Sequence, residues 1–418
     1  MEPLALFGGE KAIADITEEL FKWPIVTQED EDALLEVLRR GAMSGIDVTV
    51  KFEEEFAAWQ GAKYALGFCN GTMALQAAMF AVKLGVGDEL ICPSKGYWAS
   101  CVPAFNLGST VVFADIEKDS LCLDPNDLER CIGQQTKAIM VVHYLAHPAD
   151  MDAIMAIANR HGLMVIEDVS HAQGGLYKGK KLGSFGHVSA MSLMSGKSFA
   201  IGEAGMLVTD DKEMFDRAVA YAHYTRYGEI TTPELLKYDK IALGGMKGRL
   251  NQTCSAMGRV QLKYYDERCA EIDRAMDYLW RGLEGVRGIQ PHRVDETQGS
   301  TMAGWYAASG HYRPEELGGL PLARFCEAMR AEGVGVSPNG NFPLHTHPFF
   351  EDFNLMHTEK PARIAFAGRD VRALDHALPV SESVQVFTVP WFKKFMPEQI
   401  DKYIGAFKKV VQQAESLL

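Results

Sequence analysis

The stretch Leu163-Met164-Val165-Ile166-Glu167-Asp168 decides the fold class of this chain. Four apolar residues followed by two carboxylates predict a short buried strand that ends in polar side chains. A helix is predicted over 150–161, immediately before this strand. Open α/β sheets bind their ligands at the carboxyl ends of such strands. The stretch therefore predicts a mostly parallel sheet with Asp168 at its ligand-binding edge.

The alternation of strand and helix patterns continues on both sides of this stretch. Upstream, the predicted helices cover 27–41, 51–60 and 72–84, and the predicted strands cover 64–68, 89–92, 110–114 and 138–142. Downstream come a strand over 206–209, a helix over 212–224 and a loop-like segment over 225–250. Strands that alternate with helices imply a mostly parallel sheet covered on both faces. We therefore predict an α/β protein.

The C-terminal part of the chain has a different pattern. A long helix is predicted over about 254–285, and helices of this length often bridge domains. Further stretches suggest a smaller α+β domain, with apolar and aromatic runs near 303–307 and 385–389 and helices over 321–332 and 397–417. We predict a large domain over 1–270, which includes the N-terminal helices, and a small domain over 271–418.

Composition restricts the possible partners and the compartment. The chain has 418 residues, 47% hydrophobic content and a formal net charge of −13, which argues against a nucleic-acid or anionic-membrane partner. Its eight cysteines contain no CxxC pair, so we expect reduced thiols and neither disulfides nor a zinc site. No signal peptide and no run of about 18 apolar residues is present. We expect a soluble, cytoplasmic protein.

A lysine stands among small and apolar residues downstream of Asp168. The stretch Ser192-Leu193-Met194-Ser195-Gly196-Lys197 is followed by Gly202-Glu203-Ala204-Gly205. Burial among such residues lowers the pKa of a lysine and frees its amine to form a Schiff base. A strand-end carboxylate can keep a pyridinium nitrogen protonated. Together Lys197 and Asp168 indicate a pyridoxal-phosphate enzyme; the alternatives are an exposed loop lysine and an aspartate that caps the following loop.

The stretch Asn70-Gly71-Thr72 lies between a predicted strand and a predicted helix. Backbone amides at such a helix start point outward and favour an anion, and the hydroxyl of Thr72 stands beside them. The hydroxyl of Ser192 could meet the same phosphate. The alternative interpretation is an ordinary strand-to-helix turn with a threonine cap.

Two further side chains could contact the cofactor ring. Tyr97, shortly after Pro93, could stack on a flat ring, although a core or surface aromatic is the alternative. His171 follows Asp168 by three residues and could reach the phenolic oxygen of the cofactor. His143 and His147 are spaced like helical metal ligands, but they follow a strand and meet Pro148, so we predict no metal site.

The motifs Asn70-Gly71-Thr72, Glu167-Asp168-x-x-His171 and Ser192-x4-Lys197 occur in this order. As a set they resemble the DegT/DnrJ/EryC1/StrS family of pyridoxal-phosphate aminotransferases, which act on sugars and cyclitols. The resemblance covers nearly the whole chain, and its start, Leu4 to Gly9, is similar to the branch that contains inosose aminotransferases and aminohydroxybenzoate synthase. Within the family the chain is similar to enzymes of aminoglycoside antibiotic biosynthesis.

The resemblance implies a fold-type I aminotransferase (transaminase) that works as a homodimer with shared active sites. It also implies roles for individual residues. Lys197 would form the Schiff base, Asp168 would pair with the pyridine nitrogen, and His171 would lie near the ring hydroxyl. The remaining contacts would be stacking by Tyr97 and phosphate binding by Gly71, Thr72 and Ser192.

The chain departs from the family pattern at two positions. Ala204 replaces one of the glycines that usually follow the lysine. Lys247 stands where the partner subunit usually donates an asparagine to the phosphate. A lysine can still meet a phosphate as a point charge. The resemblance thus implies a cofactor contact of Lys247 across the dimer.

The activity implied is a two-step exchange. L-Glutamine would give its amino group to the cofactor, leaving pyridoxamine phosphate, and a cyclitol ketone would then take the amine. The alternatives are a nucleotide-sugar aminotransferase, an aminohydroxybenzoate synthase and a sugar dehydratase. Dehydratase relatives typically carry histidine at the position of Lys197, which argues against that branch. An intact Lys197 with Asp168 also disfavours a non-enzymatic binding protein on the same fold.

Overall fold

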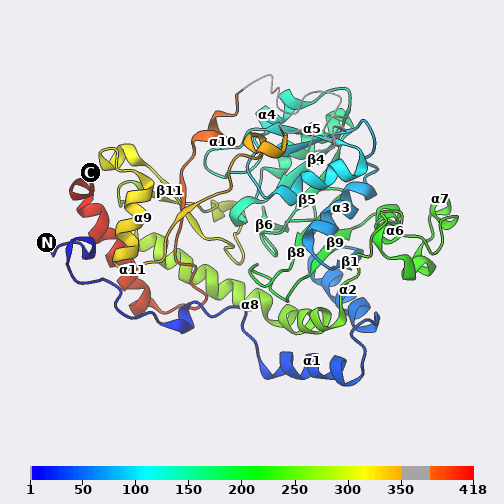
Figure 1. Cartoon of the computed structure of the whole chain (residues 1–418), viewed down its shortest axis with the longest axis horizontal. Helices are drawn as coiled ribbons and strands as arrows, with labels where there is room; N and C mark the ends of the chain where they lie inside the picture. Colours follow the sequence, from blue (N-terminus) through cyan, green and yellow to red (C-terminus); the bar gives the residue numbers. More distant parts are fainter. Residues whose placement is uncertain (1, 351–376) are drawn as a thin grey trace.

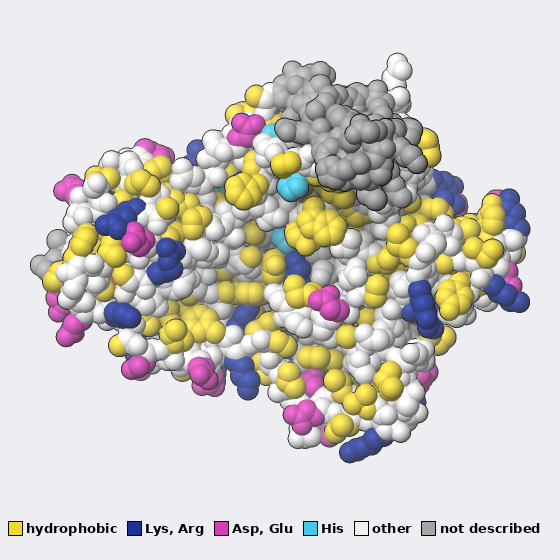
Figure 2. Space-filling view, viewed as in Figure 1, with side chains coloured by type: hydrophobic (Ala, Val, Ile, Leu, Met, Phe, Trp, Pro, Cys, Tyr) yellow, Lys and Arg dark blue, Asp and Glu magenta, His cyan; other side chains and the backbone are white. Residues whose placement is uncertain are grey.

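Figure 1 shows two lobes joined by one long helix, with both ends of the chain on the same lobe. The structure, a computed structural model, describes residues 2–350 and 377–418. Within these residues no helix is both long and apolar enough to cross a membrane. Acidic and basic side chains are interspersed over the described part of the face in Figure 2.

The larger lobe, called the sheet lobe below, is built on a seven-stranded sheet. Its strand order is β1-β9-β8-β5-β4-β2-β3. Five neighbouring strands, from β8 to β3, are parallel, whereas β9 runs antiparallel to both β1 and β8. The strands are β1 (Tyr64–Phe68), β2 (Glu89–Pro93), β3 (Thr110–Ala114), β4 (Thr136–Val142), β5 (Met164–Asp168), β8 (Val188–Ser192) and β9 (Gly205–Thr209). The predicted α/β class and mostly parallel sheet are confirmed.

Helices cover this sheet because their apolar sides need burial. The helices of the sheet lobe are α1 (Gln28–Arg39), α2 (Asp47–Gln60), α3 (Gly71–Ala81), α4 (Pro125–Cys131), α5 (Met151–His161), α6 (Lys212–Ala222) and α7 (Pro233–Leu236). The most apolar of them, α3, packs against β8, β9 and α6. The hairpin of β6 (Leu176–Tyr177) and β7 (Lys180–Lys181) completes this part.

Several helix ends differ from the prediction: α11 (Pro397–Gln412) ends five residues before the predicted 417, and one end each of α2 and α3 has an identifiable cause. Helix α2 begins four residues earlier than predicted, because the Oε1 of Gln252 accepts the backbone N–H groups of Val48 and Thr49. A cap from so far along the chain leaves no local pattern. Helix α3 ends at Ala81, three residues early, and Lys83 has a left-handed φ of 63° that a helix cannot continue through.

The smaller lobe, called the small lobe below, contains a four-stranded antiparallel sheet. Its order is β10-β11-β13-β12, formed by β10 (Ile289–Pro291), β11 (Ser309–Tyr312), β12 (Pro338–Asn339) and β13 (Val386–Thr388). The accompanying helices are α9 (Leu322–Ala331), α10 (Pro379–Ser383) and α11 (Pro397–Gln412). Strands and helices are segregated in this lobe, as the predicted α+β pattern requires.

Helix α8 (Gln252–Gly282) passes from one lobe to the other. Two hydrophobic clusters meet along it: Tyr265 and Cys269 belong to the cluster around the large sheet, and Ile272 begins the cluster of the small lobe. The switch from one hydrophobic cluster to the other along α8 supports a domain division near residue 270, which stays a prediction. The N-terminal Leu4 and Leu20 also pack in the cluster of the small lobe.

One buried lysine of the small lobe is unusual. Lys393 is 6% exposed, and its Nζ has no hydrogen-bond partner among the described residues. The amine lies over the rings of Trp23 and Trp391. Burial lowers the pKa of Lys393 to about 5, so the amine is neutral at pH 7.

Candidate active site

A cavity of about 410 Å³ opens where the central strands of the large sheet end. Asp168, Val142 and Ser192, the last residues of β5, β4 and β8, line it together with the start of α3. The cavity brings together most of the residues predicted from the sequence, namely Gly71, Thr72, Tyr97, Asp168, His171, Ser192 and Lys197. Lys247 is the predicted residue that it does not include.

The start of α3 forms a cradle at one end of the cavity. Asn70 caps the helix by accepting the N–H of Met73 at 2.9 Å, which leaves the first amides facing the cavity. A Cβ added to Gly71 would stand 2.7 Å from the Cα of Ser192, so only glycine fits there. A phosphate group fits this cradle, because the first amides of α3 and the hydroxyls of Thr72 and Ser192 can donate to it, and the backbone at Gly71 lies close to Ser192.

Asp168 supplies a carboxylate to the same cavity. It is 4% exposed and accepts hydrogen bonds from the hydroxyl of Ser100 at 2.6 Å and from the N–H of Ser170 at 3.0 Å. These two bonds fix the orientation of the carboxylate while it still lines the cavity. A buried carboxylate held in this way fits the protonated nitrogen of a pyridine ring.

The neighbouring Glu167 anchors the end of β5. Its buried carboxylate accepts N–H groups from Gly183, Phe185 and Gly186 at 2.6–2.8 Å and contacts the Nε2 of His143 at 3.0 Å. Burial would raise the pKa of Glu167, but His143 and the backbone N–H bonds together hold that pKa below its usual value. His143 is therefore part of a structural anchor for β5 and not of a pair with His147.

Lys197 is buried and lines the cavity. The residue is 9% exposed, and burial lowers the pKa of its amine to about 8, although the charge of Asp168 acts in the opposite direction. The indole of Trp23 donates to the carbonyl of Lys197 at 3.0 Å. Near neutral pH a sizeable fraction of such an amine is unprotonated and nucleophilic.

His171 reaches the cavity as a neutral ring. Burial, and then the positive charge of Lys197, hold the pKa of His171 well below its usual value. Its Nδ1 accepts the N–H of Leu145 at 3.3 Å, so the neutral ring carries its proton on Nε2. A neutral donor of this kind suits a ring hydroxyl or phenolate oxygen.

Tyr97 and Lys247 differ in their placement. Tyr97 is 50% exposed at the edge of the cavity, where its ring can stack on a flat ligand. Lys247 is exposed and does not line the cavity. It precedes Gly248, whose carbonyl accepts the N–H of Cys69 close to the phosphate cradle. A contact of Lys247 with cofactor bound in another subunit stays a prediction.

Several lining residues were not among the site residues predicted from the sequence. Ser100, Tyr306, Asn339 and Asn341 all face the cavity. Tyr306 and the two asparagines come from the small lobe, far along the chain from the motifs. No local spacing connects them to Lys197, whereas the hydroxyl of Ser100 could have been sought near Tyr97.

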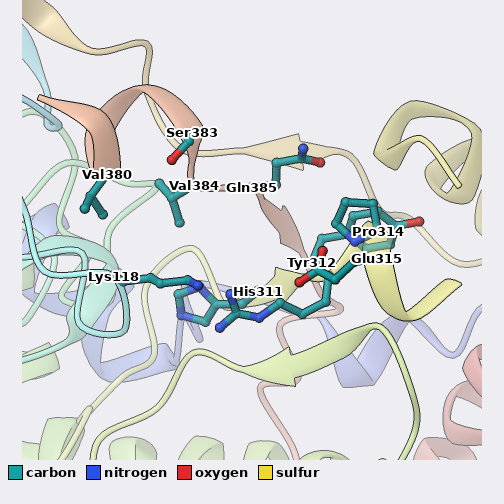
Figure 3. Close-up of a pocket in the computed structure, with 10 residues that line it drawn as sticks. Lys118, His311, Tyr312, Pro314, Glu315, Val380, Ser383, Val384 and Gln385 are labelled. Carbon is teal, nitrogen blue, oxygen red and sulfur yellow. The ribbon is translucent and has the colours of Figure 1, made fainter. Parts of the chain in front are cut away.

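A second pocket lies outside this site. It has a volume of about 240 Å³ and is lined by residues that include Lys118, His311 and Arg313, between a loop of the sheet lobe and the small lobe (Figure 3). None of the residues predicted for the cofactor lines it.

A mostly parallel sheet with a helix start, a strand-end carboxylate and a buried lysine at one cavity fits a pyridoxal-phosphate-dependent enzyme. The chain matches the DegT/DnrJ/EryC1/StrS aminotransferase family over residues 24–368, and it belongs to that family. The predicted resemblance, enzyme class and cofactor are therefore confirmed.

The chain is also similar to named relatives and to a solved structure. L-glutamine:2-deoxy-scyllo-inosose aminotransferase of Streptoalloteichus tenebrarius is 32% identical over 78% of this chain and 79% of its own. GDP-perosamine synthase of Escherichia coli O157:H7 is 37% identical over 58% of this chain and 64% of its own. The crystal structure of 3-amino-5-hydroxybenzoic acid synthase superposes with a TM-score of 0.77 at 26% identity, covering 94% of this chain and 99% of that one.

Proposed function

We propose that this protein transfers the amino group of L-glutamine to a cyclitol ketone, 2-deoxy-scyllo-inosose, in the biosynthesis of an aminoglycoside antibiotic. The observation that carries the reaction type is the buried amine of Lys197 facing one cavity with Asp168 and Gly71. The 32% identity to an aminotransferase of that name supports the choice of donor and acceptor.

Each residue has a distinct task in this proposal. Bound pyridoxal phosphate supplies an aldehyde that bonds to amines and a ring that withdraws electrons from the carbon losing its proton. Asp168 keeps the pyridine nitrogen protonated, and the amides at Gly71 and Thr72 hold the phosphate. The Nζ of Lys197, once free, takes the proton from the α-carbon of the donor.

Two asparagines that line the cavity, Asn339 and Asn341, offer polar groups to the acceptor. Asn341 is fixed, since its Nδ2 donates to the carbonyl of Gly96 at 2.6 Å and its N–H donates to the hydroxyl of Tyr144 at 2.8 Å. The Nδ2 of Asn339 donates one of its two hydrogens to the hydroxyl of Ser309 at 2.6 Å, which orients the side-chain amide. Fixed amides of this kind suit the ring hydroxyls of a cyclitol.

A second candidate acceptor is a nucleotide-sugar ketone. The 37% identity to GDP-perosamine synthase favours it, although that match covers 58% of this chain. Aromatisation, as in aminohydroxybenzoate synthesis, is a third possibility within the same fold. These alternatives keep the cofactor residues and differ in the ketone.

A half-reaction screen tests the proposal. Purified holoenzyme is mixed with single amino donors, and conversion of the cofactor to its amine form is followed by absorbance. The amine form is then offered 2-deoxy-scyllo-inosose, other cyclitol ketones and nucleotide-sugar ketones. We expect L-glutamine and 2-deoxy-scyllo-inosose to react fastest. Faster reaction with a nucleotide-sugar ketone, or an aromatised product, would replace the proposed acceptor.

We also propose a homodimer with shared active sites, supported by the exposed position of Lys247 beside the phosphate cradle. Sedimentation would give the mass of the assembly. Mixing Lys197→Ala with Lys247→Ala protein should restore activity above that of either parent if the sites are shared. A monomer, or mixtures no more active than their parents, would contradict this arrangement. A cytoplasmic location stays a prediction.

A further inference from the structure

Tyr306 covers the amine of Lys197, and the proposed function gives it no task. The Nζ of Lys197 lies 4.1 Å from the centroid of the Tyr306 ring. The same ring packs on His171 at 4.5 Å and meets Trp391 edge-on at 5.8 Å, measured between ring centroids. Its position is therefore fixed from several sides.

The backbone that carries Tyr306 is strained. Ala303, Trp305 and Ala307 have φ values of 46°, 51° and 53°, all in the left-handed region that non-glycine residues avoid. Three left-handed residues within 303–307 are stable only where tertiary contacts hold the backbone in that conformation. The indole of Trp305 donates to Asp273 at 2.7 Å, which anchors the middle of this segment.

The strained segment is also fixed directly against the residue after Lys197. A Cβ added to Gly304 would stand 2.5 Å from the Cβ of Ser198, so the two backbones approach as closely as glycine allows. The indole of Trp391 holds this approach by donating to the carbonyl of Gly304 at 2.9 Å. The ring of Tyr306 therefore keeps its place relative to Lys197.

We propose that Tyr306 is a positioning residue whose ring face holds the free amine of Lys197 at the reacting carbon whenever that amine is not bonded to the cofactor. This inference rests on the proposed role of Lys197. A lysine side chain has many rotamers, and a free amine would otherwise leave the productive position. The ring attracts the protonated amine through its face and packs against the neutral one.

The test compares ring-retaining and ring-free variants of the apo-protein. Covalent capture of added pyridoxal phosphate is followed by stopped-flow absorbance. Labelling of Lys197 by acetic anhydride, read by mass spectrometry across a pH series, gives a readout that needs no cofactor. We expect Tyr306→Leu to slow capture about five-fold and to shift the pH profile of labelling, and Tyr306→Phe to restore both.

Controls separate this role from misfolding and from the proposed function. Tyr306→Met is a second ring-free variant in case Tyr306→Leu does not fold, and Tyr238→Leu removes an exposed tyrosine outside the cavity. Wild-type capture and labelling in the ring-free variants would overturn the proposal, as would an equal loss in Tyr306→Phe, which would assign the effect to the hydroxyl. Covalent capture by Lys197→Ala would instead overturn the role of Lys197 itself.

Discussion

Lys197 combines two properties that oppose each other in most proteins: it is nearly enclosed, yet its amine opens onto a cavity. Enclosure disfavours the charged amine, and the nearby Asp168 limits that effect, so the pKa settles at about 8. The amine is thus available for bonding and can still carry a proton near neutral pH.

Removal of this amine should abolish the chemistry. We expect Lys197→Ala to lose covalent attachment of pyridoxal phosphate and to lower turnover by about 10³-fold or more, because both the bonding amine and the proton carrier are gone. Borohydride reduction followed by mass spectrometry would locate the attachment. Lys402→Ala, at an exposed position of α11, is the control. Attachment that persists at full yield in Lys197→Ala would contradict the assignment.

The pH dependence of cofactor capture follows from the same residue. Only the neutral amine attacks, so the capture rate of apo-protein should rise about ten-fold per pH unit below the pKa of about 8 and level off above it. His171 stays neutral over this range, because its pKa is held well below its usual value. Stopped-flow mixing between pH 6 and 10 would measure the profile. A rate that keeps rising to pH 10 would indicate an ordinary, solvated lysine.

At the scale of elements, the site is assembled from strand ends and one helix start. Strand β5, β8 and the start of α3 place Asp168, Ser192 and Gly71 around the same cavity. Strand β5 and helix α3 were predicted because each is short, apolar and bounded by polar or glycine residues, whereas no strand was predicted over β8. The strained segment that carries Tyr306 was not, since its left-handed residues are held by tertiary contacts and not by glycines.

The close contact between α3 and β8 leaves no space for a side chain at Gly71. We expect Gly71→Ala to weaken the affinity of apo-protein for pyridoxal phosphate by about ten-fold or more, because a Cβ 2.7 Å from Ser192 must displace the cradle. Fluorescence titration would measure the affinity. Gly405→Ala, in α11 with no atom within 4 Å of the added Cβ, is the matched control. Unchanged affinity in Gly71→Ala would show that the cradle does not hold the phosphate.

Across the whole molecule, the sequence predicted cavity residues of the sheet lobe but not those of the small lobe. The motifs near the large sheet predicted residues that line one cavity, because neighbouring strand ends converge by topology. Asn339 and Asn341 enter the cavity from the small lobe through contacts such as that of Asn341 with Tyr144. The packing of one lobe against the other places these two asparagines in the cavity, and a local sequence pattern cannot predict that packing.

The buried Lys393 should make the free energy of unfolding of the protein depend on pH. Its pKa is about 5 when folded and about 10.4 in an unfolded chain, so the unfolded state binds the extra proton between these values. The free energy of unfolding should therefore rise with pH across this window, by up to about 1.4 kcal/mol per pH unit. Lys393→Met should remove this slope and raise Tm at pH 7.

Thermal denaturation of both proteins between pH 6 and 9 would measure this effect. Lys402→Met is the control, because that lysine is exposed and its substitution should leave the slope unchanged. An equal slope in wild type and Lys393→Met would mean that Lys393 is charged in the folded protein.

Helix α8 also limits how the enzyme can move. Its 31 residues extend about 46 Å without interruption through the place where the two hydrophobic clusters meet. A hinge between the lobes would have to bend this helix or break its hydrogen bonds between Cys269 and Ile272. The continuous helix therefore opposes bending between the lobes at the point where their hydrophobic clusters meet.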